Sequence, residues 1–142
     1  YENVCFFFFI SLDGVKGRKV DMELTLRPGN EQEMYRKFAV HFAQDDTCHT
    51  AVSFRPYESV VKVDRKYSGS RKSTIHERCC FVPGGNGHIK LRVILDRFSA
   101  EIFVNDGEYA LSLTFYTDIA ADGISFFADG DVAMDVVKYD LI

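Results

Sequence analysis

Residues 89–107 read IKLRVILDRFSAEIFVNDG, and this stretch decides the fold class. Apolar residues occupy every second position from Ile89 to Leu95 and again from Ala100 to Val104. Such a period of two is typical of a β-strand with one buried and one solvated face. The stretch ends in Asn105-Asp106-Gly107, residue types that tolerate the positive φ angles of a tight hairpin turn. We therefore expect two consecutive strands followed by a turn into a third.

The same alternation recurs along the rest of the chain, in residues 20–26, 38–42, 50–54, 61–63, 111–115, 124–128 and 132–136. With a first apolar run at residues 4–10, this makes about ten short strands separated by turn residues. The pattern predicts an all-β fold, an antiparallel two-sheet β-sandwich of the concanavalin or lectin-like jelly-roll type. Thirteen Phe residues indicate a core built largely from aromatic rings. We expect residues 1–142 to form a single domain.

The first run, Val4–Ile10, does not alternate, because Phe6, Phe7, Phe8 and Phe9 follow one another directly. Two interpretations are open. The run is a strand covered on both faces, or a strand whose outward face packs against a partner domain. On the second interpretation these four Phe residues are candidate domain-interface residues.

Several function classes lack their usual sequence features. The net charge is −4 and no basic block is present, so we expect no nucleic-acid partner. The longest apolar run is far too short to span a bilayer, so we expect no membrane partner. No HExxH pair or phosphate-binding glycine motif occurs, and we predict no cofactor.

Four cysteines lie at positions 5, 48, 79 and 80, without the spaced pairs of a zinc site or a disulfide framework. A metal site made of Cys48, His49, His76 and Cys79 is conceivable. We favour small apolar thiols in a reducing compartment, with no metal, and therefore a cytoplasmic location.

Residues 90–107 resemble the signature hairpin in the C-terminal domain of glycoside hydrolase family 32, which includes invertases, levanases, inulinases and sucrose-6-phosphate hydrolases. Asp96-Arg97-Phe98-Ser99-Ala100-Glu101-Ile102-Phe103 matches that hairpin, with Phe98 where Ser is usual. Further similar segments flank this hairpin in the family's order: Val63–Gly69 before it, and Gly123–Ala128 and Val136–Leu141 after it. The resemblance also implies a relation to carbohydrate-binding module family 66.

The resemblance implies a partner, an N-terminal five-bladed β-propeller in the same polypeptide, which carries the catalytic residues. The chain starts at Tyr1 within strand-like sequence, so we expect a C-terminal fragment of such an enzyme. The catalytic motifs of the family are missing, since the chain has no Trp and no Arg-Asp-Pro. We therefore expect no enzyme activity from this chain alone. It would be a non-catalytic accessory domain that stabilises the propeller of a sucrose, sucrose-6-phosphate or fructan hydrolase. A homodimer is a further candidate assembly. If the parent enzyme is a levanase, we expect it to be secreted.

Two alternatives stay open. The first is a fructose- or fructan-binding module, since planar polar side chains over an aromatic ring recognise sugar hydroxyls. Its candidate residues are Arg65, Glu77, Arg97 and Glu101, with Tyr57 or Tyr67 as the aromatic platform. Glu101 is informative because it shares the outward face of its strand with the apolar Phe103. The second alternative, an independent sandwich-fold glycoside hydrolase, requires two facing carboxyl groups that the sequence does not single out.

Overall fold

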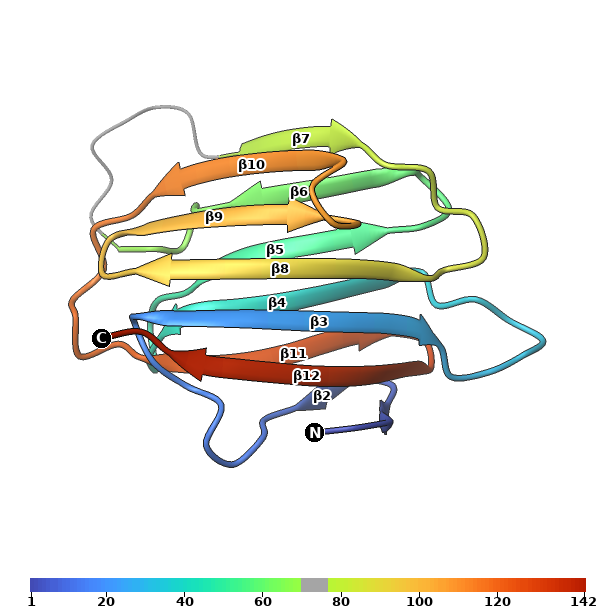
Figure 1. Ribbon diagram of the computed structural model, residues 1–142, viewed down its shortest axis with the longest axis horizontal. Helices are drawn as coiled ribbons and strands as arrows, with labels where there is room; N and C mark the ends of the chain where they lie inside the picture. The colour runs from blue at the N-terminus through green and yellow to red at the C-terminus, as the bar shows by residue number, and fades with distance from the viewer. Residues whose placement is uncertain (70–76) are drawn as a thin grey trace.

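The computed structural model describes residues 1–69 and 77–142, and these residues form two stacked antiparallel sheets (Figure 1). In sheet order, the first contains β1 (Val4–Phe6), β12 (Val132–Asp140), β3 (Val20–Pro28), β8 (Ile89–Asp96), β9 (Ser99–Val104) and β10 (Tyr109–Thr114). The second contains β2 (Phe9–Ile10), β11 (Gly123–Asp129), β4 (Lys37–Gln44), β5 (Thr50–Arg55), β6 (Val60–Asp64) and β7 (Glu77–Phe81). We call them sheet A and sheet B. The predicted β-sandwich is confirmed.

The alternation in sequence becomes the two faces of each sheet. In β3, Met22, Leu24 and Leu26 are fully buried, while the residues between them are half exposed. The hairpin predicted from residues 89–107 is also present, since β8, β9 and β10 are consecutive neighbours in sheet A. Asn105, Asp106 and Gly107 have φ angles of 49°, 59° and 92°, the left-handed region that their residue types tolerate.

The core between the sheets is aromatic, as the Phe content predicts. Its largest fully buried side chains include Tyr35, Phe38, Phe42, Phe54 and Phe126. Each such ring removed from water contributes roughly 1.5–3 kcal/mol to folding. Tyr35 also satisfies its hydroxyl, which donates to the Gly87 carbonyl oxygen at 2.6 Å. Burial raises the pKa of Tyr35, which therefore stays neutral.

The apolar run at residues 4–10 is not one strand, so that expectation is wrong. Val4–Phe6 pairs with β12 in sheet A, and Phe9–Ile10 pairs with β11 in sheet B. Phe7 and Phe8 form the bend between them, so the chain crosses from one sheet to the other. The structure also contains a strand that the sequence pattern does not predict, β7. Its exposed edge position leaves Glu77–Phe81 without an apolar alternation.

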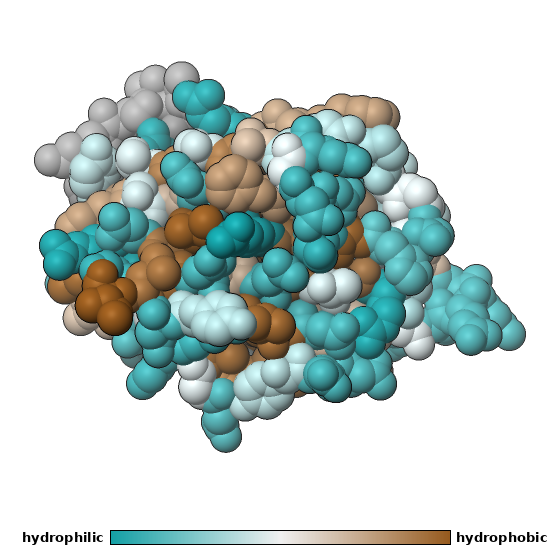
Figure 2. Space-filling model, viewed as in Figure 1, coloured by the Kyte–Doolittle hydropathy of each residue, from teal (hydrophilic) through white to brown (hydrophobic). Residues whose placement is uncertain are grey.

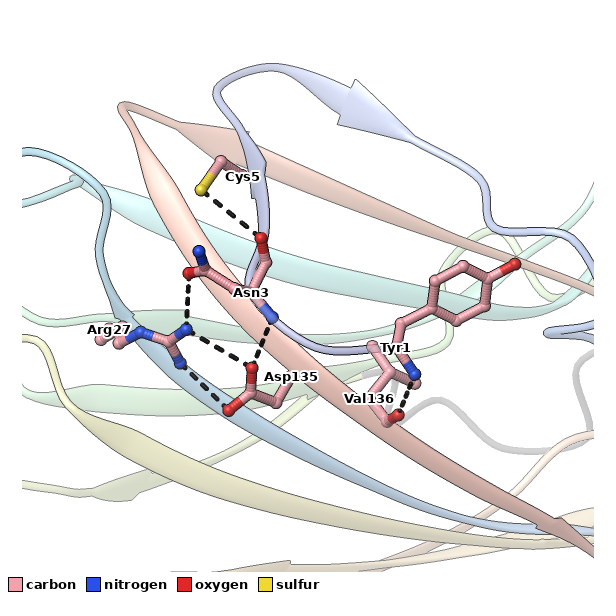
Figure 3. A network of polar contacts seen from close by, with 6 residues as sticks. All are labelled: Tyr1, Asn3, Cys5, Arg27, Asp135 and Val136. Carbon is pink, nitrogen blue, oxygen red and sulfur yellow. Dashed lines mark hydrogen bonds and ion pairs between the residues drawn. The ribbon is translucent and has the colours of Figure 1, made fainter.

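Polar contacts tie the N-terminal segment to sheet A (Figure 3). The carboxylate of Asp135 accepts hydrogen bonds from the Asn3 backbone nitrogen at 2.6 Å and from Arg27 Nη1 at 3.2 Å. Both contacts lower the pKa of Asp135, the Asn3 bond most. The Tyr1 nitrogen donates to the Val136 carbonyl oxygen at 2.9 Å. These bonds hold the start of the chain along β12 and so fix where the Phe7–Phe8 bend lies.

No segment described by the structure is helical, and accordingly it contains no helix long and apolar enough to cross a membrane.

Candidate functional site

A cleft of about 340 Å³ opens where β7, the edge of sheet B, approaches β10, the edge of sheet A. Sheet B supplies Val63, Glu77 and Arg78, with Arg65 from the segment after β6. Strands β9 and β10 supply the opposite wall, which includes Glu101. Three of the residues predicted for sugar recognition, Arg65, Glu77 and Glu101, thus line one cleft although 36 positions separate the first from the last.

Arg65 links the two sheets across this cleft. Its Nη1 donates to the Thr114 carbonyl oxygen at 2.8 Å, at the last residue of β10. Arg65 Nη1 also lies 3.5 Å from Thr114 Oγ1, so the guanidinium contacts both the backbone and the side chain of that residue. Arg65 therefore has a fixed position at the mouth of the cleft.

Glu77 is held by two lysines. Its carboxylate lies 2.6 Å from Lys66 Nζ and 3.6 Å from Lys62 Nζ. The hydrogen bond from Lys66 is the main cause of a lowered Glu77 pKa. A carboxylate kept ionised accepts hydrogen bonds from hydroxyl groups but cannot donate a proton as a general acid. The cleft is thus suited to binding a polar ligand rather than to acid catalysis by Glu77.

Glu101 lies in the middle of β9, opposite Ser112 of β10 and Ile94 of β8. Its side chain is exposed, and Phe103 two positions on is half-buried on the same outward face. The placement expected from the alternation is therefore observed. Arg78 and the hydroxyl residues Ser99, Ser112 and Thr114 also line the cleft, and no motif or alternation in the sequence singles them out.

The other predicted binding residues lie elsewhere. The Arg97 carbonyl oxygen accepts a hydrogen bond from Arg18 Nε at 2.9 Å, and its side chain does not line the cleft. Tyr57 is 62% exposed, and its hydroxyl donates to the Met34 carbonyl oxygen at 3.2 Å. Tyr67, also 62% exposed, lies with its ring centre 5.4 Å from that of His49. The structure therefore brings neither tyrosine into the cleft as an aromatic platform.

Tyr67 instead ends a row of five aromatic rings. The rings of Phe9, Phe127, His41, His49 and Tyr67 follow one another at centre-to-centre distances of 5.0, 4.4, 4.2 and 5.4 Å. The two imidazoles are parallel to within 2°. We call this set the aromatic row. Sequence reasoning missed it because the partners lie up to 118 positions apart and meet only through strand pairing.

Burial lowers the pKa of His41 to about 4, and the neighbouring His49 and Lys37 act in the same direction. The pKa of His49 is lowered as well, again mainly by burial. Both imidazoles are therefore neutral at pH 7, which removes the charge repulsion that would oppose their stacking.

The predicted interface residues divide into two groups. Phe6 points into the core, 8% exposed, and packs edge-on against Phe38 with ring centres 6.4 Å apart. Phe7 and Phe8 are each 70% exposed, and Phe9 is 48% exposed. With Phe127 they border a shallow apolar hollow of about 530 Å³. We call Phe7, Phe8, Phe9 and Phe127 the apolar patch.

The conceivable metal site cannot be assembled from the described residues. Within residues 1–69 and 77–142, no three His, Cys, Asp or Glu side chains gather closely enough to hold a metal ion. His76 lies outside the described residues. All four cysteines are free thiols.

Comparison with known proteins agrees with the resemblance seen in the hairpin. The family model "Glycosyl hydrolases family 32 C terminal" matches residues 9–141. A levanase from Bacillus sp. (strain L7) is 34% identical over 117 residues, which is 79% of this chain and 12% of that protein. A sucrose-6-phosphate hydrolase from Staphylococcus xylosus is 25% identical over 94% of this chain and 26% of its own length.

Solved structures share the fold. The exo-inulinase from Aspergillus awamori superposes with a TM-score of 0.77 at 17% identity, covering 99% of this chain and 27% of that one. The sucrose-6-phosphate hydrolase from Lactobacillus gasseri gives a TM-score of 0.73 at 19% identity, covering 100% of this chain and 28% of that one. The chain therefore spans about a quarter or less of the length of these relatives. Because the family model matches residues 9–141, this chain belongs to the C-terminal domain family of glycosyl hydrolases family 32.

Proposed function

We propose that this chain is the non-catalytic accessory domain of a β-fructosidase and that it stabilises a catalytic β-propeller of the same polypeptide by packing against it. The observation that carries the proposal is the family match over residues 9–141 in a chain that spans only 12% and 26% of two relatives. The names of those relatives, a levanase and a sucrose-6-phosphate hydrolase, support a parent enzyme that acts on β-fructofuranosides.

We assign the docking surface to the apolar patch together with the aromatic row. Phe7 and Phe8 lie at a bend, and each is 70% exposed, far more than the rings of the core. Adjacent exposed aromatic rings are typical of a surface that a partner covers. Each Phe buried on docking contributes roughly 1.5–3 kcal/mol. The occupant we propose is the propeller, because the larger part of the relatives' length lies outside the region that this chain matches.

The docking surface is tested in the polypeptide that carries both domains. Replacing Phe7 and Phe8 by Ser removes apolar area only at the interface, so the melting temperature of the propeller should fall. Phe81→Ser is the matched control, since Phe81 is 68% exposed but lies on β7, away from the apolar patch. Equal melting temperatures for the double variant and the control would overturn the assignment.

A second copy of the chain is the competing occupant of the apolar patch. It would appear as a concentration-dependent dimer of the chain alone in sedimentation experiments. A dimer that dissociates in the Phe7→Ser, Phe8→Ser double variant would place self-association on this surface and contradict the propeller as its occupant. A chain that stays monomeric supports the proposal.

A second candidate function, recognition of fructose units, is favoured by one observation: Arg65, Glu77 and Glu101 line the same cleft. A guanidinium donor beside two carboxylate acceptors complements adjacent hydroxyl groups of a sugar. Calorimetric titration of the chain with fructose and levan tests this candidate. Saturable heat that disappears in Glu101→Gln would support it, and flat titrations at millimolar sugar would contradict it.

We also propose a reducing compartment such as the cytoplasm. The four free thiols support this proposal, because exposed cysteines such as Cys5 and Cys79 tend to oxidise in secreted proteins. Localisation of the parent polypeptide by cell fractionation tests it.

A further inference from the structure

The outer face of sheet A carries a second pocket, of about 250 Å³, at the opposite end of β9 from the β8–β9 turn. This face is mostly hydrophilic with separate hydrophobic areas (Figure 2). Strand register places Glu23 of β3, Arg92 of β8 and Phe103 of β9 in one row across the sheet. Lys90, Asp106 and Gly107 complete the pocket wall.

Phe103 forms the apolar part of the pocket. Its ring is half-buried on a face that is otherwise polar, and its cross-strand neighbour on β10 is Ala110. Because the Ala110 side chain is small, that side of the ring is not covered by a large neighbour. A half-exposed ring with polar groups at its margin suits the apolar face of a sugar ring, which needs contact on one side and hydrogen bonds at its edge.

The turn that supplies Asp106 is fixed onto β8. The Asn105 nitrogen donates to the Lys90 carbonyl oxygen at 2.9 Å, and Asn105 Oδ1 accepts from the Lys90 nitrogen at 3.0 Å. These two hydrogen bonds hold Asp106 beside the Lys90 side chain. Lys90 Nζ lies 3.1 Å from Asp106 Oδ1 and 3.8 Å from Glu23 Oε1. The polar groups of the pocket are therefore held in place before any ligand arrives.

The charges of the pocket exclude an anionic ligand. Lys90 lies between Glu23 and Asp106, while Arg92 makes two bonds to Asp21, Nε to Oδ1 at 3.0 Å and Nη2 to Oδ2 at 2.6 Å. Two cations thus face three carboxylates, which leaves no surplus positive charge for a phosphate or a polyanion. The same groups offer both donors and acceptors, which is what neutral hydroxyl groups require.

We propose that this pocket binds one ring of a neutral sugar, with a ring face against Phe103 and hydroxyl groups bonded to Lys90 and Asp106. The site is separate from the cleft between β7 and β10. It does not depend on the proposed docking or on sugar recognition in that cleft. Residues Glu101 and Phe103 lie two positions apart on the same face of β9, so two sites would be roughly 7 Å apart along the strand.

The test follows backbone amide resonances of the isotope-labelled chain while D-fructose, sucrose or inorganic phosphate is added. We expect saturable shifts at Lys90, Phe103 and Gly107 with at least one of the two sugars and none with phosphate. Phe103→Ala should weaken that binding about tenfold, because it removes the stacking surface. Asp106→Asn should weaken it as well, and Asn keeps the turn because it tolerates positive φ.

Glu101→Gln is the matched control, since it changes the other cleft and leaves Phe103 in place. Unchanged sugar shifts at Phe103 in this variant support the second pocket. Shifts lost in Glu101→Gln but retained in Phe103→Ala would place the sugar in the cleft and overturn the proposal. Shifts at Phe103 caused by phosphate, or no shifts there with either sugar, would overturn it too.

Discussion

The guanidinium carbon of Arg18 lies 5.3 Å from the centre of the Phe98 ring, and this contact explains two residues that sequence reasoning left unexplained. Arg18 is only 6% exposed, and it also lies 5.2 Å from the Phe115 ring centre. Its nitrogens donate to backbone carbonyl oxygens of Arg97, Thr117, Asp118 and Ala121. One side chain therefore connects the β8–β9 turn to the loop that follows β10.

Replacing Arg18 by Met should lower the free energy of unfolding by about 3–5 kcal/mol, because four carbonyl groups lose a charged donor in a buried place. Urea unfolding at pH 7 measures this loss. Arg97→Ala is the control, since its exposed side chain should contribute less than about 0.5 kcal/mol. An Arg18→Met variant as stable as the control would contradict this role.

Phe98→Ser restores the residue that the family resemblance leads one to expect. The change removes one of the two rings against Arg18 but leaves all its hydrogen bonds. We expect a loss of about 0.5–1 kcal/mol, the size of an exposed cation–π contact. The loss should vanish in an Arg18→Met background, which a double-mutant cycle measures. Equal losses in both backgrounds would show that Phe98 acts independently of Arg18.

Acid should destabilise the chain through His41. Its pKa is about 4 in the folded state against an ordinary value of 6.5, so the unfolded chain binds a proton first as pH falls. The contribution of neutral His41 to the free energy of unfolding is fully present above pH 6.5, and it is lost as the pH falls from there to about 4. Allowing for the partial exposure of the ring, we expect a loss of about 1–2 kcal/mol.

His41→Phe keeps an aromatic ring in the aromatic row and removes the titrating group. Unfolding free energies at pH 7 and pH 5 should differ less in this variant than in the parent chain. Carboxylates titrate in both proteins and cancel in the comparison. An identical pH dependence in His41→Phe and the parent chain would contradict the assignment.

Local patterns in the sequence were sufficient for most of the fold. The burial of Met22, Leu24 and Leu26 and the positive φ angles of the Asn105-Asp106-Gly107 turn depend on neighbours in sequence, so alternation and turn chemistry predict them. Strand β7 and the split of residues 4–10 depend on which sheet edge is free and on how the chain changes sheets. No local pattern encodes either property.

The candidate site shows the same division. Outward-facing polar residues such as Glu101 follow from alternation, and Arg65 and Glu77 meet it in the cleft. The tyrosines were chosen by residue type alone, and tertiary contacts direct Tyr57 to Met34 and Tyr67 to His49. The buried Arg18 gave no signal, because its acceptors are main-chain carbonyls about 80 to 100 positions away.

We propose that this chain is an accessory domain without catalytic activity of its own, and an assay for the release of glucose and fructose from sucrose tests this proposal. The purified chain, at concentrations equal to those of the substrate, is incubated with sucrose, and free glucose and fructose are assayed enzymatically. We expect no release above that of a no-protein control. Release that is lost in the Glu77→Gln or Glu101→Gln variant would contradict it, because the carboxylates of the cleft would then be catalytic.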